Sequence, residues 1–225
     1  MNKEDVNKVT RIVWKRLSDV YNLKDFAIYK DNNKMLFSDI NQGDLGDCYF
    51  LCALCSIGEF PELLKMFFNN MNIGNNGVLE CNFYIHGKKT QVVIDDYFPF
   101  KEIILKDKEM KQPKLELMYA NFNPKHNNLW AVILEKCWAK LNGSYHAIAK
   151  GMVSDAFEVL FPFPVETYPN HIYGQERLWE IIEEADNEKY MLCADISGDE
   201  DDPFFKAYPT LGLVSGHAYT LIGCQ

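Results

Sequence analysis

The sequence lacks the features that would place the protein in a membrane, outside the cell or on nucleic acid. It has no run of about 18 apolar residues, so no membrane-spanning helix is expected. Its start, MNKEDV, is not an apolar segment of the signal-peptide type. Positive charge is also scarce, because 23 Lys and Arg stand against 32 Asp and Glu, for a net charge of −9. Such a surface does not attract nucleic acids or anionic membranes. We therefore expect a cytoplasmic protein that binds neither.

A disulfide framework is absent as well. The seven cysteines are an odd number, and most of them lie inside apolar helix-like or strand-like patterns. Reduced thiols in a cytosolic protein explain this distribution better than paired cysteines do. With 225 residues and 48% hydrophobic content, the chain is long and apolar enough for one large domain or two small ones.

The most informative stretch of the chain is DINQGDLGDCYFLCALCSI, residues 39–57. A polar loop with two glycines leads directly into an apolar helix pattern, and Cys48 stands at the junction. Unpaired N–H groups and the helix dipole at a helix N-terminus favour the thiolate form of a cysteine. The side-chain amide of Gln42 can donate a hydrogen bond to an oxyanion formed beside that thiolate. Cys48 is therefore a candidate nucleophile.

A histidine near the other end supplies the second half of this chemistry. The run GHAYTLIG, residues 216–223, reads as a strand that begins at His217. A cysteine far upstream of a histidine is the chain order of papain-like proteases. In such a pair the thiolate attacks a carbonyl carbon, and the imidazolium then protonates the leaving amine.

Hydrophobic periodicity predicts the remaining elements. We expect a β-hairpin from two strands that flank His86 and Gly87, and a boundary at the proline-rich run FPFPV, residues 161–165. The predicted helices cover residues 6–21, 48–57, 61–67, 129–141, 147–160 and 176–185, and the predicted strands cover 78–85, 89–94, 190–196 and 213–224.

Four motifs in order resemble the catalytic core of calpains, which are calcium-regulated intracellular cysteine endopeptidases. They are DINQGDLGDC at 39–48, VVIDD at 92–96, LWAVILEKCWAKLNGSY at 129–145 and GHAY at 216–219. The resemblance implies hydrolysis of internal peptide bonds in protein substrates. It also implies Cys48 as nucleophile, His217 as general acid and base, and Gln42 as the oxyanion-hole residue.

The same resemblance implies an α+β fold of the papain-like cysteine peptidase type. Residues 1–163 would form a helical subdomain carrying Cys48, and residues 164–225 an incomplete β-rich subdomain carrying His217. The family's third catalytic residue is an Asn in an Asn-Pro-Trp motif on the next strand, and the sequence ends eight residues after His217. We therefore expect a truncated core.

Calcium is the cofactor that the resemblance implies. The first calcium site of the family uses an acidic residue nine positions before the cysteine, which is Asp39 here. It also uses a carboxylate two positions before the tryptophan of the long helix, and that position is Asn128. Because a carboxylate is replaced by a neutral amide, we expect weak or absent calcium binding.

Alternative interpretations remain for these residues. A single cysteine at a helix start is more often a packing residue, and without the Asn the chain could be a non-catalytic module that binds protein partners. The spacing of Cys48, Cys52 and Cys55 matches that of a [4Fe–4S] site in radical-SAM enzymes, but these thiols lie in an apolar run typical of a buried helix. We interpret His86, His126, His146 and His171 as surface or turn residues, and Asp95 with Asp96 as a turn rather than an acid/base pair.

Overall fold

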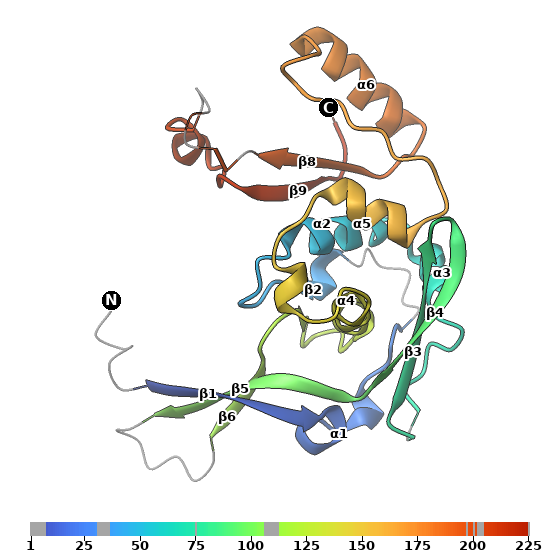
Figure 1. Cartoon of the computed structure of the whole chain (residues 1–225), viewed down its shortest axis with the longest axis vertical. Helices are drawn as coiled ribbons and strands as arrows, with labels where there is room; N and C mark the ends of the chain where they lie inside the picture. The colour runs from blue at the N-terminus through green and yellow to red at the C-terminus, as the bar shows by residue number, and fades with distance from the viewer. Residues whose placement is uncertain are drawn as a thin grey trace.

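The computed structural model describes residues 8–30, 37–74, 76–105, 113–196, 198–199, 201 and 205–224. Helices and small antiparallel sheets alternate along this part of the chain, which makes the fold mixed α+β. Helix α4 (Trp130–Leu141) lies near the middle of the molecule (Figure 1). Helices α2 (Cys48–Ile57) and α5 (Val153–Leu160) lie on one side of it, and the sheet β1-β5-β6 lies on the other (Figure 1).

The N-terminal segment is a strand, so the predicted helix over residues 6–21 is wrong. Strand β1 (Lys8–Arg16) pairs antiparallel with β5 (Tyr97–Leu105), and Val13 lies opposite Phe100. Strand β6 (Lys114–Leu117) pairs with the other edge of β5. Of the range predicted as helix, only α1 (Leu17–Val20) is helical, and residue 6 lies outside the described part. The β-branched residues of this segment suit a strand once a partner is available, and the partner is distant in sequence.

The predicted hairpin is confirmed. Strands β3 (Val78–Ile85) and β4 (Lys88–Asp95) pair in antiparallel register, with Ile85 opposite Lys88. His86 and Gly87 form the connection with φ of 50° and 72°. Two consecutive positive φ angles are typical of the tight turn whose twist matches that of the flanking strands.

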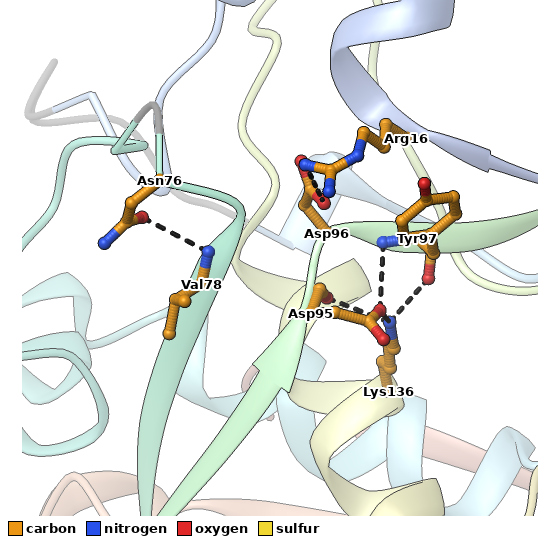
Figure 2. A network of polar contacts seen from close by, with 7 residues as sticks. All are labelled: Arg16, Asn76, Val78, Asp95, Asp96, Tyr97 and Lys136. Atoms are coloured by element: carbon orange, nitrogen blue, oxygen red, sulfur yellow. Dashed lines mark hydrogen bonds and ion pairs between the residues drawn. The ribbon is translucent and has the colours of Figure 1, made fainter.

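The adjacent carboxylates at the end of β4 serve different partners, as predicted for a turn rather than an acid/base pair (Figure 2). Lys136 Nζ donates hydrogen bonds to the carbonyl oxygens of Asp95, at 2.9 Å, and Tyr97, at 2.5 Å. Arg16 Nη1 lies 3.2 Å from Asp96 Oδ1. Burial lowers the pKa of Lys136 even though Asp95 acts in the opposite direction. Lys136 thus joins α4 to the start of β5, and Arg16 joins β1 to the residue between β4 and β5.

We expect Lys136→Met to lower the free energy of unfolding by about 1–3 kcal/mol, because it removes a charged, largely buried donor together with its hydrogen bonds to Asp95 and Tyr97. Urea denaturation measures this loss. The control is Lys65→Met on the surface of α3 (Leu64–Phe67), which should change stability by less than about 0.5 kcal/mol. Equal effects of the two substitutions would contradict a stabilising role for the Lys136 contacts.

Helix α2 is apolar on every face because it is covered on two sides. On one side Phe50 stacks on Trp138 of α4 with ring centroids 5.5 Å apart, and Trp138 Nε1 donates to Tyr49 Oη at 2.9 Å. On the other side lie the antiparallel strands β8 (Leu192–Ile196) and β9 (His217–Leu221) (Figure 1). A helix that is hydrophobic all round is expected in such a buried position.

Most of the other predicted elements are confirmed with small shifts. Helix α6 (Gln175–Asn187), β8 and β9 lie within or close to their predicted ranges, whereas the helix predicted over 147–160 becomes a short turn (His146–Ile148) followed by α5. Strand β2 (Ile40–Asn41) pairs with β7 (Asn121–Phe122). Short 3₁₀ turns cover Leu23–Asp25, Phe37–Asp39, Pro61–Leu63 and Tyr208–Leu211.

The description of residues 1–163 as helical is too narrow, since β1 to β7 lie in this part together with α1 to α5. Helix α5 ends at Leu160, where the proline-rich run begins, and α6 is the next element along the chain. The boundary between 163 and 164 stays a prediction. Within the described residues, no helix has the length and apolar character needed to cross a bilayer.

Candidate active site

Cys48 is the first residue of α2 and is partly exposed. The residue before it, Asp47, occupies the N-cap position, and its carbonyl oxygen accepts the N–H groups of Phe50 and Leu51 at 2.9 and 3.1 Å. The thiol therefore stands where the backbone N–H groups of the first turn and the helix dipole favour negative charge. The predicted loop-to-helix junction is present in the structure.

Gln42 lies in the loop before the helix, with an exposed side chain. Its Nε2 donates a hydrogen bond to the carbonyl oxygen of Leu45 at 2.8 Å. Asp44 N donates to Met118 O at 3.0 Å, which ties the loop to the segment before β7. One N–H of the Gln42 amide thus holds the side chain against its own loop, and the amide carries a second N–H that can act as a donor.

The loop packs so closely on its neighbours that Gly43 has no room for a side chain. A Cβ at this position would lie 2.1 Å from Tyr119 O and 2.4 Å from Met118 O, both of which are backbone atoms. We expect Gly43→Ala to lower the free energy of unfolding by about 1–3 kcal/mol through displacement of the loop. The control is Gly223→Ala, whose Cβ would meet Asp186 at an ordinary 3.7 Å. Thermal unfolding of both variants distinguishes a tight loop from a general effect of replacing glycine.

His217 is the first residue of β9 and is partly exposed. Its ring lies edge-on to Tyr219 with centroids 5.0 Å apart, and Tyr219 Oη accepts the N–H of Val214 at 2.8 Å. Gly216 precedes it with φ of 66°, a conformation that glycine adopts without strain. The turn before the strand and the tyrosine within it thus define where the imidazole lies.

The contacts between α2 and the β8–β9 pair show how Cys48 and His217 are related. Near the end of the helix, Ser56 Oγ lies 3.4 Å from Leu192 O and 3.1 Å from Cys193 Sγ. One turn earlier, Thr220 Oγ1 donates to Cys52 O at 2.9 Å.

Strands β8 and β9 are antiparallel, with Cys193 opposite Thr220 and Ile196 opposite His217. The end of the strand pair that contains Ile196 and His217 therefore lies toward the N-terminus of α2. Cys48 is one turn beyond Cys52, and His217 is three residues beyond Thr220. Both candidate residues therefore stand at the same end of the α2–β9 contact. Within the described part of the chain, no hydrogen bond joins their side chains.

A pair of buried carboxyl groups lies directly behind the nucleophile position, and sequence reasoning missed it. Asp47 is fully buried and Glu135 of α4 is 1% exposed, and the two carboxyl groups interact. Burial raises the pKa of Asp47 to about 6, and burial together with Asp47 raises the pKa of Glu135 well above its ordinary value.

Glu135 Oε1 also accepts the N–H of Ala120 at 2.8 Å, whereas among the described residues neither carboxyl oxygen of Asp47 has a hydrogen-bond partner. The raised pKa of Glu135 favours its neutral form, which carries an O–H that can act as a donor. The available signal in the sequence was a glutamate directly after the apolar run of residues 130–134 in α4.

Comparisons with known proteins identify the family of the chain. The family described as "Calpain family cysteine protease" matches residues 1–225. The chain belongs to the calpain family. It is 31% identical to mouse calpain-9 over 218 residues, which cover 94% of this chain and 28% of the relative. It is 32% identical to human calpain-14 over 219 residues, or 96% and 28% of the two chains. It is 29% identical to the human calpain-2 catalytic subunit over 230 residues, or 97% and 29%.

The chain spans less than a third of the length of these calpain relatives. Family membership identifies a cysteine protease domain of the calpain family. The order of Gln42, Cys48 and His217 along the chain follows the calpain motifs from which these residues were identified.

The residues at the implied calcium position do not fit a calcium ion. Asp39 is 1% exposed and both of its carboxylate oxygens accept hydrogen bonds from side chains of the chain itself. Asn128, which stands where the family has a carboxylate, turns its NH₂ group toward Asp39 and uses its oxygen elsewhere. Calcium needs six to eight oxygen ligands, and these oxygen atoms already have partners.

The iron–sulfur interpretation also finds no support in the calpain fold. Cys52 is buried with its Sγ 3.5 Å from Thr220 Oγ1, and in the described residues no group of three or more His, Cys, Asp or Glu side chains is placed to hold a metal ion.

A cavity of about 460 Å³ lies away from the candidate site, between the β3–β4 turn and residues 161–164. None of the candidate catalytic residues lines it.

Proposed function

We propose that the chain is a calpain-type cysteine endopeptidase core that hydrolyses internal peptide bonds of proteins. The observation that carries the proposal is the packing of β9 along α2, with His217 and Cys48 at the same end of this contact. A nucleophile on a helix N-terminus and a base on a facing strand are the two parts that cysteine protease chemistry requires.

In the proposed reaction, His217 takes the proton of the Cys48 thiol and the thiolate attacks the carbonyl carbon of the scissile bond. The C–S bond forms while the carbonyl electrons move to oxygen. Collapse of this intermediate breaks the C–N bond, and the imidazolium transfers its proton to the leaving amine. Water then attacks the thioester with His217 as base, which releases the acid product and restores the thiol.

Gln42 would stabilise the oxyanion of this intermediate. One N–H of its amide is held by Leu45 O at 2.8 Å, which limits the positions that the second N–H can reach. A preorganised donor stabilises the developing charge without reorganising during the reaction. Because the side-chain oxygen atoms of Asp39 and Asn128 already accept hydrogen bonds, we assign no step to calcium.

A peptidyl thiol-reactive probe tests the nucleophile. We expect the chain to be labelled at Cys48 and Cys48→Ala to lose this labelling. The matched control is Cys55→Ala on the same helix, which should label like the unmodified chain, because burial raises the pKa of Cys55 to about 12 and keeps it a poor nucleophile. Equal labelling of the unmodified chain and Cys48→Ala would contradict the assignment and favour a non-catalytic module that binds protein partners.

A further inference from the structure

The buried carboxylate of Asp39 is saturated by N–H donors from one short segment. His126 Nδ1 contacts Oδ1, while Asn128 Nδ2 donates to Oδ2 at 2.8 Å. Trp130 Nε1 lies 3.4 Å from the same Oδ2. A carboxylate that is 1% exposed is costly unless it is hydrogen-bonded. Here the segment of residues 126–130 provides those hydrogen bonds.

The amide of Asn128 has only one orientation that satisfies both of its neighbours. Its Oδ1 accepts the N–H of Lys30 at 3.0 Å, so its NH₂ group must face Asp39. Rotating the amide by 180° would set NH₂ against the Lys30 N–H and an oxygen against the carboxylate. Asn128 therefore presents hydrogen atoms, not a ligand oxygen, to the position beside Asp39.

Asp39 also anchors the loop that carries Gln42. Asp39 O accepts the N–H of Asn123 at 3.2 Å, and Ile40 next to it pairs with Phe122. Trp130 is fully buried as the first residue of α4. The contacts of Asp39 thus join three parts of the site region: the loop before Cys48, the turn before α4 and α4 itself.

We propose that in this chain hydrogen bonds from His126, Asn128 and Trp130 do at Asp39 what a bound divalent cation would do, so that the Gln42 loop is held without metal. A cation beside Asp39 would meet three N–H donors instead of ligand oxygens. His126 has this role because the fold brings it to a carboxylate 87 residues away in sequence. The inference concerns structure and metal binding, and it does not depend on the proposed proteolysis.

Calcium-dependent thermal unfolding tests the proposal on the full chain. The unfolding temperature of the unmodified chain should be the same in millimolar calcium and in chelator. The double substitution His126→Ser with Asn128→Glu removes two donors and adds a carboxylate. We expect this variant to be less stable in chelator and to gain about 5–10 °C at calcium concentrations 100-fold above its Kd. The matched control, His126→Ser with Asn128→Gln, should not respond to calcium.

Terbium luminescence excited through tryptophan gives an independent measurement, since Trp130 lies 3.4 Å from Asp39. A terbium ion bound beside Asp39 would give a luminescence signal that calcium displaces and that Trp130→Phe removes. The unmodified chain should show no such signal. Such a signal, or a calcium-dependent rise in its unfolding temperature, would overturn the proposal. A folded double variant that does not respond to calcium would also overturn it, because the donors of His126 and Asn128 would then not be what excludes the ion. If the double variant does not fold, the two measurements on the unmodified chain decide.

Discussion

His217→Ala is expected to lower kcat/KM for a casein-type protein substrate by at least about 10⁴-fold, since it removes both the base that activates the thiol and the acid that protonates the leaving amine. The fold should persist, because His217 is partly exposed and the contacts that hold β9 on α2 come from Thr220 and from the buried Ala218. Hydrolysis of the substrate measures the loss, and circular dichroism measures the fold.

His171→Ala is the matched control for this substitution. His171 is exposed and lies between α5 and α6, in a part of the chain that contributes nothing to the proposed site. Its removal should leave hydrolysis unchanged. Activity that survives His217→Ala while the protein stays folded would show that His217 is a packing residue and that another group activates the thiol.

Glu135→Ala is expected to lower the free energy of unfolding by about 2–6 kcal/mol, because it leaves two buried polar groups without their partner and each such loss costs about 1–3 kcal/mol. The carboxyl group of Asp47 would remain fully buried without the neighbouring carboxyl group with which it interacts. The N–H of Ala120 would also lose its acceptor at 2.8 Å. Urea denaturation at neutral pH measures the loss, and a change below about 1 kcal/mol, which is typical of a site without special contacts, would contradict a stabilising role for Glu135.

Glu135→Gln separates hydrogen bonding from titration at this pair. The amide can donate to Asp47 and accept the N–H of Ala120, so most of the stability should be retained. In the unfolded chain a glutamate releases its proton near about pH 4.3, whereas the raised pKa of Glu135 keeps the proton in the folded protein.

Above that pH the unfolded state binds fewer protons than the folded state, so the free energy of unfolding falls as pH rises. The slope reaches up to about 1.4 kcal/mol per pH unit for each proton. Asp47, whose pKa is raised to about 6, acts in the same direction. Urea denaturation at pH 5 and at pH 8, about one unit below and two units above that pKa, measures this slope. The free energy of unfolding should decrease less between these two values for Glu135→Gln than for the unmodified chain. Parallel curves for the two proteins would contradict proton retention by Glu135.

Local pattern is sufficient for the elements whose residues contact their sequence neighbours. The helix at 48–57, the long helix at 129–141 and the hairpin around His86 and Gly87 follow from periodicity and turn residues alone. The motifs that contain Gln42, Cys48 and His217 are each contiguous in sequence, so the residues alone are enough to identify them. Their catalytic roles remain predictions.

The amino-acid sequence alone thus specified the mixed α+β character, most helices and the candidate catalytic residues. Contacts between distant segments determined the rest, and these are visible only in the folded chain. Residues 8–16 form a strand because β5 lies beside them, and the apolar helix α2 is buried because α4 and β9 cover opposite sides. His126 contacts Asp39 and Glu135 contacts Asp47 because the chain brings each pair together. Hydrophobic periodicity reports which residues avoid water, and it does not report which distant polar group each buried carboxylate will meet.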